Sequence, residues 1–222
     1  MDKVTYIDHS SFLLELDDRA FLFDYWKGDI PPTDKPLYIF SSHRHRDHFN
    51  EYIMNMPARK IILSNDIRVK PTENTLKIGT NKSVDIDGMK VTTLKSTDEG
   101  VAFIIEYKGK IIYHAGDLND WYWEGEDEKE NLRMRESYRH IIKKGFENIP
   151  KVDIAFLLVD PRQENECGCG TDFFLENVEA KHIFPMHFWG DHKRVEEYIR
   201  TRKENIYTIT HTQQVFELEG LI

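Results

Sequence analysis

Residues 41–49 read Ser-Ser-His-Arg-His-Arg-Asp-His-Phe, and this stretch decides what the rest of the chain is expected to form. It directly follows Leu37-Tyr38-Ile39-Phe40, a β-branched and aromatic run that predicts a short buried strand. A loop at the end of a buried strand holds its side chains on a rigid base. We therefore expect this loop to form a functional site.

The spacing of the polar residues in this loop indicates metal binding. His43 and His45 are two positions apart, so both imidazoles can point to one side of an extended segment and share an ion. Asp47 and His48 lie past the turn, where they can serve a second ion. Imidazole with carboxylate suits zinc, manganese or iron better than calcium or magnesium. The alternative is a solvated charged loop, since arginines alternate with the histidines, but this order of residues after a buried strand favours metal.

Three motifs in chain order resemble those of one known family. His43-x-His45-x-Asp47-His48 resembles the signature of the metallo-β-lactamase-fold hydrolases, and Tyr113-His114-Ala115-Gly116-Asp117-Leu118 resembles their strand-end Gly-Asp motif. Phe184-Pro185-Met186-His187-Phe188 resembles their late strand-end histidine. Residues 12–15 and 21–24 resemble the opening strands, so the likeness covers nearly the whole chain. It is closest to the branch of the ascorbate-phosphate lactonases and many uncharacterised bacterial zinc-dependent hydrolases.

The resemblance implies a fold, a cofactor and a ligand set. The implied fold is α/β (α+β), a four-layer αββα sandwich with the metal site at one sheet edge. The implied cofactor is one or two zinc ions, with manganese or iron as alternatives. The first ion takes His43 and His45, the second takes Asp47, His48 and His187, and Asp117 bridges the two. Asp47 is also the candidate catalytic residue, orienting the attacking water or moving a proton.

The chain departs from the family pattern at one point. The family supplies a further histidine to the first ion, but residues 94–100 read Leu-Lys-Ser-Thr-Asp-Glu-Gly. Ser96 occupies the matching position, and a hydroxyl is a poor zinc ligand; Asp98 is the candidate substitute. Without a substitute, the first site is expected to be weaker or more open. The alternative is a single ion in the second site.

Two other histidines lie close to the motifs. His114 precedes Asp117 by three residues, and we favour a partner that orients a ligand over a spare ligand. His9 and Asp24 lie near strand ends, from which they can approach the metal loop. For His9 we favour a turn histidine that is hydrogen-bonded to the backbone.

Aromatic residues follow the metal motifs. Trp121, Trp123 and Trp189 are candidates for the wall of a substrate pocket, with core packing as the alternative. Arg162 is a candidate anchor for an anionic substrate group, with a structural salt bridge to Asp160 as the alternative.

The composition sets further limits. With 222 residues, 40% of them hydrophobic, we expect one domain over residues 1–222. The net charge of −9 disfavours a nucleic-acid partner, and no apolar run predicts a membrane partner. Cys167 and Cys169 are too close for an ordinary disulfide, so we expect a reduced, cytoplasmic protein. Soft-metal binding by this pair is the alternative to a glycine-rich loop with incidental thiols.

Hydrophobic periodicity and turn signals predict the elements. Strands are expected at residues 4–7, 12–16, 20–25, 37–40, 60–63, 83–86, 89–94, 101–107, 110–114, 152–159, 181–184, 206–209 and 213–218, with 66–80 as a connection. Helices are expected at 50–56, 127–146, 172–178 and 191–202.

The function expected from these features is hydrolysis of a small-molecule ester, lactone or phosphoester by a metal-activated water. The alternatives are a phosphodiesterase or nuclease, or a metal-binding or sensor protein without turnover.

Overall fold

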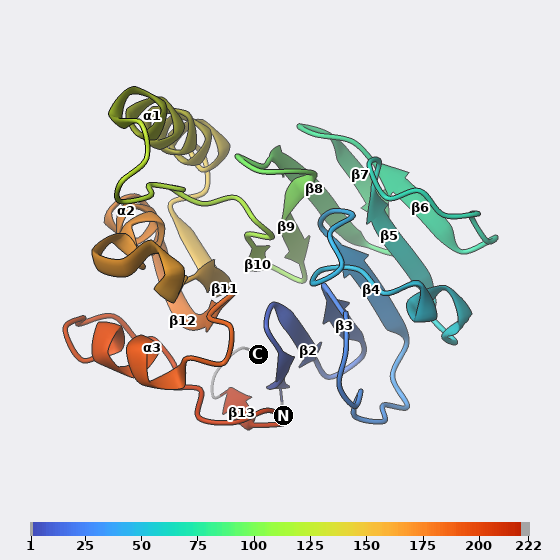
Figure 1. The fold of residues 1–222 in the computed structure, drawn as a ribbon. Coiled ribbons are helices and arrows are strands. Elements are labelled where there is room, and N and C mark those ends of the chain that lie inside the picture. The colour runs from blue at the N-terminus through green and yellow to red at the C-terminus, as the bar shows by residue number, and fades with distance from the viewer. Residues whose placement is uncertain (1, 219–222) are drawn as a thin grey trace.

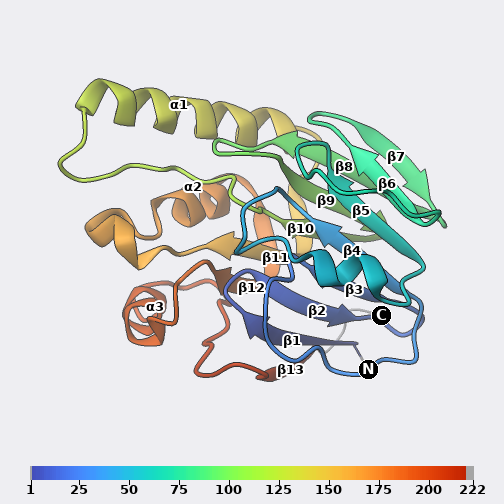
Figure 2. The same cartoon turned by 45° about the vertical axis from the view of Figure 1, so that its right-hand side comes forward.

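A computed structural model describes residues 2–218 and contains two β-sheets packed face to face (Figures 1 and 2). The first sheet has the order β13-β1-β2-β3-β4-β5-β6 and the second β12-β11-β10-β9-β8-β7. The strands of the first are β1 (Asp2–Asp8), β2 (Ser11–Glu15), β3 (Ala20–Phe23), β4 (Leu37–Ser41), β5 (Lys60–Ser64), β6 (Thr75–Ile78) and β13 (Val215–Leu218). Those of the second are β7 (Ser83–Ile86), β8 (Met89–Lys95), β9 (Val101–Tyr107), β10 (Lys110–His114), β11 (Lys151–Leu158) and β12 (Glu179–Met186).

Short turns explain the antiparallel parts of both sheets. The strands β1, β2 and β3 form the expected antiparallel meander, because the turns between them leave no room for a crossover. In the second sheet, Asp87-Gly88 and Lys108-Gly109 close two hairpins with positive φ at all four residues. Longer connections lead to the parallel pairs, which are β3 to β6 in one sheet and β10 to β12 in the other.

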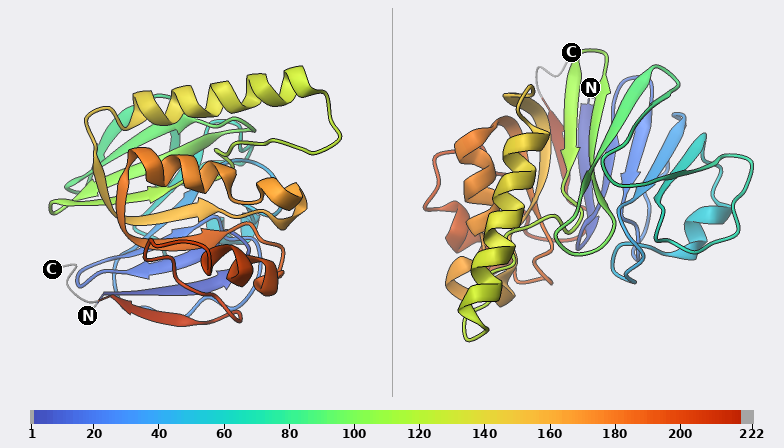
Figure 3. Two further views of the ribbon diagram at one scale, coloured as in Figure 1. Left: turned by 90° about the vertical axis from the view of Figure 1, so that its left-hand side faces the viewer. Right: turned by 90° about the horizontal axis from the view of Figure 1, so that it is seen from above.

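Apolar side chains from the two inner sheet faces form the main core, which includes Phe23, Phe40, Phe103 and Phe156. Helices α1 (Glu128–Gly145), α2 (Cys169–Asn177) and α3 (His192–Ile199) lie on the outer side of the six-stranded sheet (Figure 3). The outer face of the other sheet is covered by loops and the 3-10 helix η1 (Glu51–Asn55), whose Ile53 is buried against it. The expected αββα sandwich is therefore confirmed, with its fourth layer reduced to this short helix and loops.

Two local predictions were wrong. Residues 75–78 form strand β6 inside the segment expected to be a connection, because pairing with β5 supplies an order that the weak local pattern does not. Residues 206–209 contain only an isolated bridge between Ile206 and Ile183 instead of a strand. The short helix expected at 50–56 is confirmed as the 3-10 helix η1, whereas the 3-10 helix η2 (Pro161–Glu166) was not expected. Among the helices of residues 2–218, none has the length and apolar character of a membrane span.

The parallel relation of non-neighbouring strands creates the site. The strands β1, β3 and β4 all run in one direction, as do β8, β10, β11 and β12 in the other sheet. Their carboxyl ends are followed by His9, Asp24, the metal loop, Asp98, Asp117, Asp160 and His187. Polar residues far apart in sequence thus meet where the two sheets end.

Candidate metal centre

The loop after β4 is folded back on itself. The backbone N–H groups of His48 and Phe49 both donate to the carbonyl of His45, each at 3.0 Å. This turn separates His43 and His45 from Asp47 and His48, as their spacing predicted. His43 and His48 are fully buried, whereas His45 is partly exposed.

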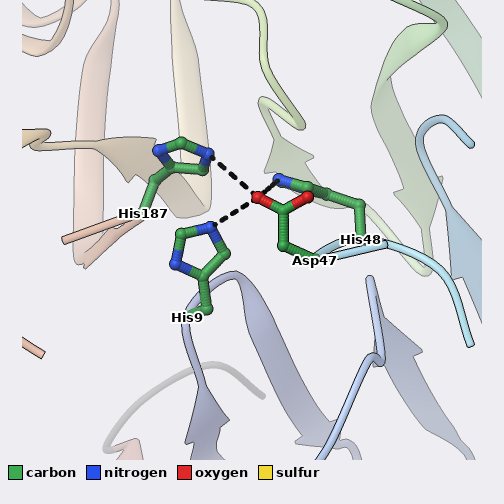
Figure 4. A group of neighbouring side chains, drawn as sticks. All are labelled: His9, Asp47, His48 and His187. Atoms are coloured by element: carbon green, nitrogen blue, oxygen red, sulfur yellow. Dashed lines mark ion pairs between the residues drawn. The ribbon is translucent and has the colours of Figure 1, made fainter. Parts of the chain in front are cut away.

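Two groups of donors meet at the sheet ends. The first group is His43, His45, Asp98 and Asp117, and the second is His9, Asp47, His48 and His187. Within each group the ligand atoms all lie within 4.8 Å of one another. Figure 4 shows the side chains of the second group converging on the carboxylate of Asp47.

Asp117 lies between the two groups. Its Oδ2 is 3.3 Å from Nε2 of His43, and its Oδ1 is 3.1 Å from Nε2 of His48 and 3.4 Å from Nε2 of His187. One carboxylate oxygen thus faces each group, which is the arrangement that a bridging ligand requires. The turn before it needs Gly116, which has φ +54° and on which a Cβ would lie 2.6 Å from Cβ of Ser42.

The hydrogen bonding of the donors fits a metal. Buried atoms without a hydrogen-bond partner within residues 2–218 include Nε2 of His48, Nε2 of His187, Oδ1 of Asp117 and both ring nitrogens of His9. Buried polar atoms normally have partners, and leaving them unpaired is unfavourable. Of these atoms, Nε2 of His9, His48 and His187 all lie near Oδ2 of Asp47, so a cation at this point would satisfy them together with Oδ1 of Asp117.

Two buried carboxylates contact His48 and His187 through the Nδ1 atoms of their rings. Oδ2 of Asp24 is 2.8 Å from Nδ1 of His48, and Oδ2 of Asp160 is 3.0 Å from Nδ1 of His187. A carboxylate on Nδ1 favours the tautomer with its proton there, which leaves the Nε2 lone pair for a metal. Asp24 also accepts from the N–H and the hydroxyl of Ser42, both at 2.7 Å.

The pKa values of several donor residues are shifted by burial and by the charges packed around them. Burial favours the neutral form of Asp117, but the charges of His48 and His187 outweigh it and hold its pKa well below the usual range. Burial likewise opposes a charge on His48, but Asp117 and then Asp24 raise its pKa well above the ordinary value. Burial lowers the pKa of His9 to about 4, so that imidazole is neutral at pH 7. A concentration of carboxylates around neutral or paired imidazoles is what a divalent cation stabilises.

The structure shows which side chain of residues 94–100 reaches the first donor group, where the family pattern has a histidine. Asp98 belongs to the first group, with its Oδ2 3.4 Å from Nδ1 of His45. Ser96 is buried outside both groups, and its hydroxyl accepts from the backbone N–H of Asp98 at 3.1 Å. Ser96 therefore supports the loop from which the Asp98 carboxylate reaches the site.

His114 lies behind the centre. Its Nε2 contacts the carbonyl of Ser10 at 3.2 Å and its Nδ1 accepts from the N–H of Gly116 at 3.2 Å, so both nitrogens are used by backbone. The ring also stacks on Phe23, with centroids 4.9 Å apart. This placement fits a residue that holds the Asp117 turn better than a spare ligand.

Sequence reasoning placed His9 within reach of the metal loop but did not select it as a ligand. The hydrogen bond to backbone that we favoured for its side chain is absent among the described residues, and Nε2 instead lies 3.3 Å from Oδ2 of Asp47. The turn brings it there with φ +55°, an unusual value for a residue other than glycine. The available signal was its position directly after the first strand.

Sequence comparison assigns the chain to a family. The model of the beta-lactamase superfamily domain matches residues 3–131, which is more than half of the chain and includes the metal loop and Asp117. The chain belongs to the beta-lactamase superfamily. A UPF0173 metal-dependent hydrolase of Methanosarcina barkeri is 28% identical over 142 residues. That alignment covers 52% of this chain and 60% of the relative, so the chain spans about three fifths of its length.

Solved structures agree in fold. A metallo hydrolase from Ignicoccus hospitalis superposes with a TM-score of 0.63 at 16% identity, covering 98% of this chain and 99% of that one. The diiron β-hydroxylase CmlA from Streptomyces venezuelae also gives 0.63, at 10% identity, covering 98% of this chain and 54% of that one. At these identities the likeness concerns the fold alone.

In this superfamily member a pocket of about 410 Å³ opens beside the donors. Five of the donors line it, namely His45, Asp47, Asp98, Asp117 and His187. The other lining residues are Thr97, Trp121, Trp123, Met134, Arg162 and Trp189. All four pocket candidates named from the sequence therefore contribute to its wall.

The pocket wall is held by specific contacts. The rings of Trp121 and Trp123 stack with centroids 5.7 Å apart, and Nε1 of Trp121 donates to the carbonyl of Asp117 at 3.0 Å. Arg162 lies near the faces of Trp189 and Trp123, at 4.7 and 5.7 Å from their centroids. Its Nε donates to both oxygens of Asp160, so the expected salt bridge and the pocket position are both present.

The two cysteines lie apart from the donors. Both are free thiols, and the Sγ of Cys169 donates to the carbonyl of Asp120 at 3.4 Å. Within residues 2–218, neither belongs to a group of side chains that could hold a metal ion. This placement supports incidental thiols over a soft-metal site.

Proposed function

We propose that this chain is a metal-dependent hydrolase that cleaves a small ester, lactone or phosphoester in the 410 Å³ pocket. The observation that carries the proposal is a set of buried, unpartnered donor atoms around one carboxylate that faces both donor groups. The family assignment and the metal-dependent hydrolases among the relatives support it.

The ligand assignment follows the two groups. The first ion would be held by His43, His45, Asp98 and Asp117, and the second by Asp47, His48, His187 and Asp117. Divalent ions bound there supply Lewis acidity and lower the pKa of water towards neutrality.

Asp47 would orient the attacking water. It lines the pocket with its side chain 22% exposed, so one oxygen can accept a hydrogen bond from a water that enters. Burial alone would raise its pKa, but the contact with His9 and the charge of His48 outweigh this and leave the pKa below its ordinary value. A carboxylate that stays ionised is a poor proton carrier, which favours orientation over proton transfer.

The donor types bear on the identity of the metal. The second group is rich in imidazole, which favours zinc, whereas the first combines two imidazoles with two carboxylates and also suits manganese or iron. A diiron protein shares the fold. We therefore propose zinc in the second position and zinc, manganese or iron in the first.

The pocket wall indicates the substrate class. The stacked Trp121 and Trp123 rings offer a flat apolar surface, and Arg162 is the one Lys or Arg in the described lining. The bonds to Asp160 use Nε and Nη2 of Arg162, which leaves Nη1 for a ligand. A small substrate with a planar body and one anionic group fits this wall. A polynucleotide fits less well, because the chain carries a net charge of −9.

The test combines metal content with turnover. The protein is purified without added metal, analysed for zinc, manganese and iron, and assayed on aryl esters, aryl lactones and aryl phosphodiesters with and without an anionic substituent. We expect turnover that is lost with a chelator and restored by added ion. His187→Ala should lose bound metal and activity, while His182→Ala, a matched change of a buried histidine outside both groups, should keep both.

Arg162 is tested in the same panel. Arg162→Met should raise KM about tenfold or more for anionic substrates and little for neutral ones, with Arg162→Lys in between. Failure of the chain to bind metal after reconstitution would overturn the proposed function. Equal effects on anionic and neutral substrates would overturn only the role given to Arg162.

A further inference from the structure

His9 is the one member of the second donor group that the proposed ligand set does not use. Its side chain is 1% exposed, and neither ring nitrogen has a hydrogen-bond partner among residues 2–218. The ring packs against those of His187 and Trp189, with centroids 4.2 and 4.3 Å away. A histidine needs at least one partner when buried, so this environment calls for a further group.

The backbone holds His9 in place. Its N–H donates to the hydroxyl of Tyr6 at 2.9 Å, and its carbonyl accepts from the N–H of His187 at 3.3 Å. His9 and His187, from opposite sheets, are thus joined through the main chain, and both have positive φ, +55° and +64°. Unusual backbone that is held by hydrogen bonds from both sides is typical of functional sites.

The distances match a coordination shell. Oδ2 of Asp47 lies 3.3 Å from Nε2 of His9, 3.8 Å from that of His48 and 3.9 Å from that of His187. Ligands about 2.0–2.2 Å from one zinc ion are separated from each other by roughly 3–4 Å. Oδ1 of Asp117 meets the same criterion towards His48 and His187, at 3.1 and 3.4 Å.

We propose that His9 is a ligand of the second position. Together with Asp47, His48, His187 and one oxygen of Asp117 it makes a five-donor shell. This inference rests on the metal binding assumed in the proposed function.

The two metal positions are therefore expected to differ in how tightly they hold an ion. The first position has four donors, two of which, His45 and Asp98, have side chains 42% and 40% exposed at the pocket. A shell filled by protein holds its ion tightly, whereas a shell with free positions leaves them for water and substrate. The second ion is therefore the tightly held one, and the first is exchangeable and meets the substrate.

The experiment measures ion retention in the full chain. Wild type, His9→Gln and His182→Gln are loaded with zinc, dialysed against a chromophoric chelator of graded concentration, and analysed for ions per chain. We expect one readily lost and one retained ion in wild type and in His182→Gln. In His9→Gln the dissociation constant of the retained ion should rise about 100-fold, and Asp98→Ala should lose the exchangeable ion alone.

A second measurement distinguishes a His9 that binds the metal from a His9 that only positions Asp47. With one cobalt ion per chain, the visible spectrum of wild type should show the low intensity of five-coordination, and His9→Gln should change both its position and its intensity. His9→Asn, which keeps a small polar side chain in the turn, covers the case in which the glutamine variant does not fold.

The outcomes are distinguishable. Unchanged retention and an unchanged cobalt spectrum in the His9 variants would overturn the inference and leave the proposed function intact. Weaker retention with an unchanged spectrum would also overturn it, because His9 would then only position Asp47. No ion in wild type would overturn both proposals.

Discussion

The two donor groups lie side by side but are supported very differently. In the second group, His48 and His187 each rest on a buried carboxylate through Nδ1, at 2.8 and 3.0 Å. In the first group, among residues 2–218, only His43 has a comparable support, the Ser42 hydroxyl at 2.9 Å. His45 and Asp98 project from loops into solvent, beside the surface pair Arg44–Glu99.

This difference in support should affect how strongly each group binds its ion. Buried partners fix the tautomer and the direction of a ligand before the ion arrives, so binding loses little further side-chain entropy. Exposed ligands must be ordered by the ion itself, which weakens binding but lets the shell adjust to an incoming molecule. A pre-organised group next to an adaptable one is suited to keeping one ion while the other exchanges ligands.

The largest effect is expected from Asp24→Asn, which alters the support of the second group. The amide would place an N–H opposite Nδ1 of His48 and favour the tautomer with its proton on Nε2, the atom needed for metal. We expect zinc affinity of the retained ion to fall about 100-fold, and unfolding free energy in urea to fall by about 3 kcal/mol.

The control for Asp24 is Asp153→Asn, the same change at the opposite end of the second sheet. Asp153 accepts from the backbone N–H of Ile111 at 2.8 Å, so stability should drop slightly and zinc affinity not at all. Equal losses of zinc affinity in both variants would show that tautomer control by Asp24 is unimportant.

An intermediate effect, in the opposite direction, is expected from Asp98→His in the first group. A third imidazole beside His43 and His45 suits zinc better than a carboxylate does. We expect the exchangeable zinc to bind about tenfold more tightly, and manganese to bind more weakly, in competition titrations. Glu99→His is the control, because Glu99 neighbours His45 but lies outside the donor group; a similar gain there would contradict the assignment of Asp98.

The smallest effect is expected from Glu99→Gln, which removes the exposed ion pair with Arg44. Solvent screens such a pair, so the urea midpoint and the retained ion should be unchanged within error. Loss of the retained ion would mean that the surface of the first group controls the second, contrary to the comparison above.

Local sequence pattern predicted most of the fold and the core of the site. The apolar run before His43 and the Asp87-Gly88 and Lys108-Gly109 turns specify their strands without outside help, since turn chemistry and burial act within a few residues. The failures at residues 75–78 and 206–209 have the opposite cause. Strand β6 exists because β5 lies beside it, and residues 206–209 find only one bridge to β12.

The candidate site divides in the same way. The residue types and spacing of the metal loop, Asp117 and His187 were readable, because each follows a predicted strand. The Asp98 substitution was open in the sequence, since Ser96 and Asp98 were both within reach of the missing position. The choice between them depends on a loop whose Ser96 hydroxyl is turned to the backbone N–H of Asp98.

By itself, then, the sequence determined two sheets, a loop rich in metal ligands and the likeness to one superfamily. These follow from periodicity, turn residues and motif spacing, which are local properties. Only the tertiary structure decided that His9 joins Asp47, that Asp24 and Asp160 stand behind two ligands, and that three tryptophans share one pocket with Arg162. The physical reason is that strands from two sheets end at one edge. The distance between their last residues depends on how the sheets pack, and a short stretch of sequence does not specify that packing.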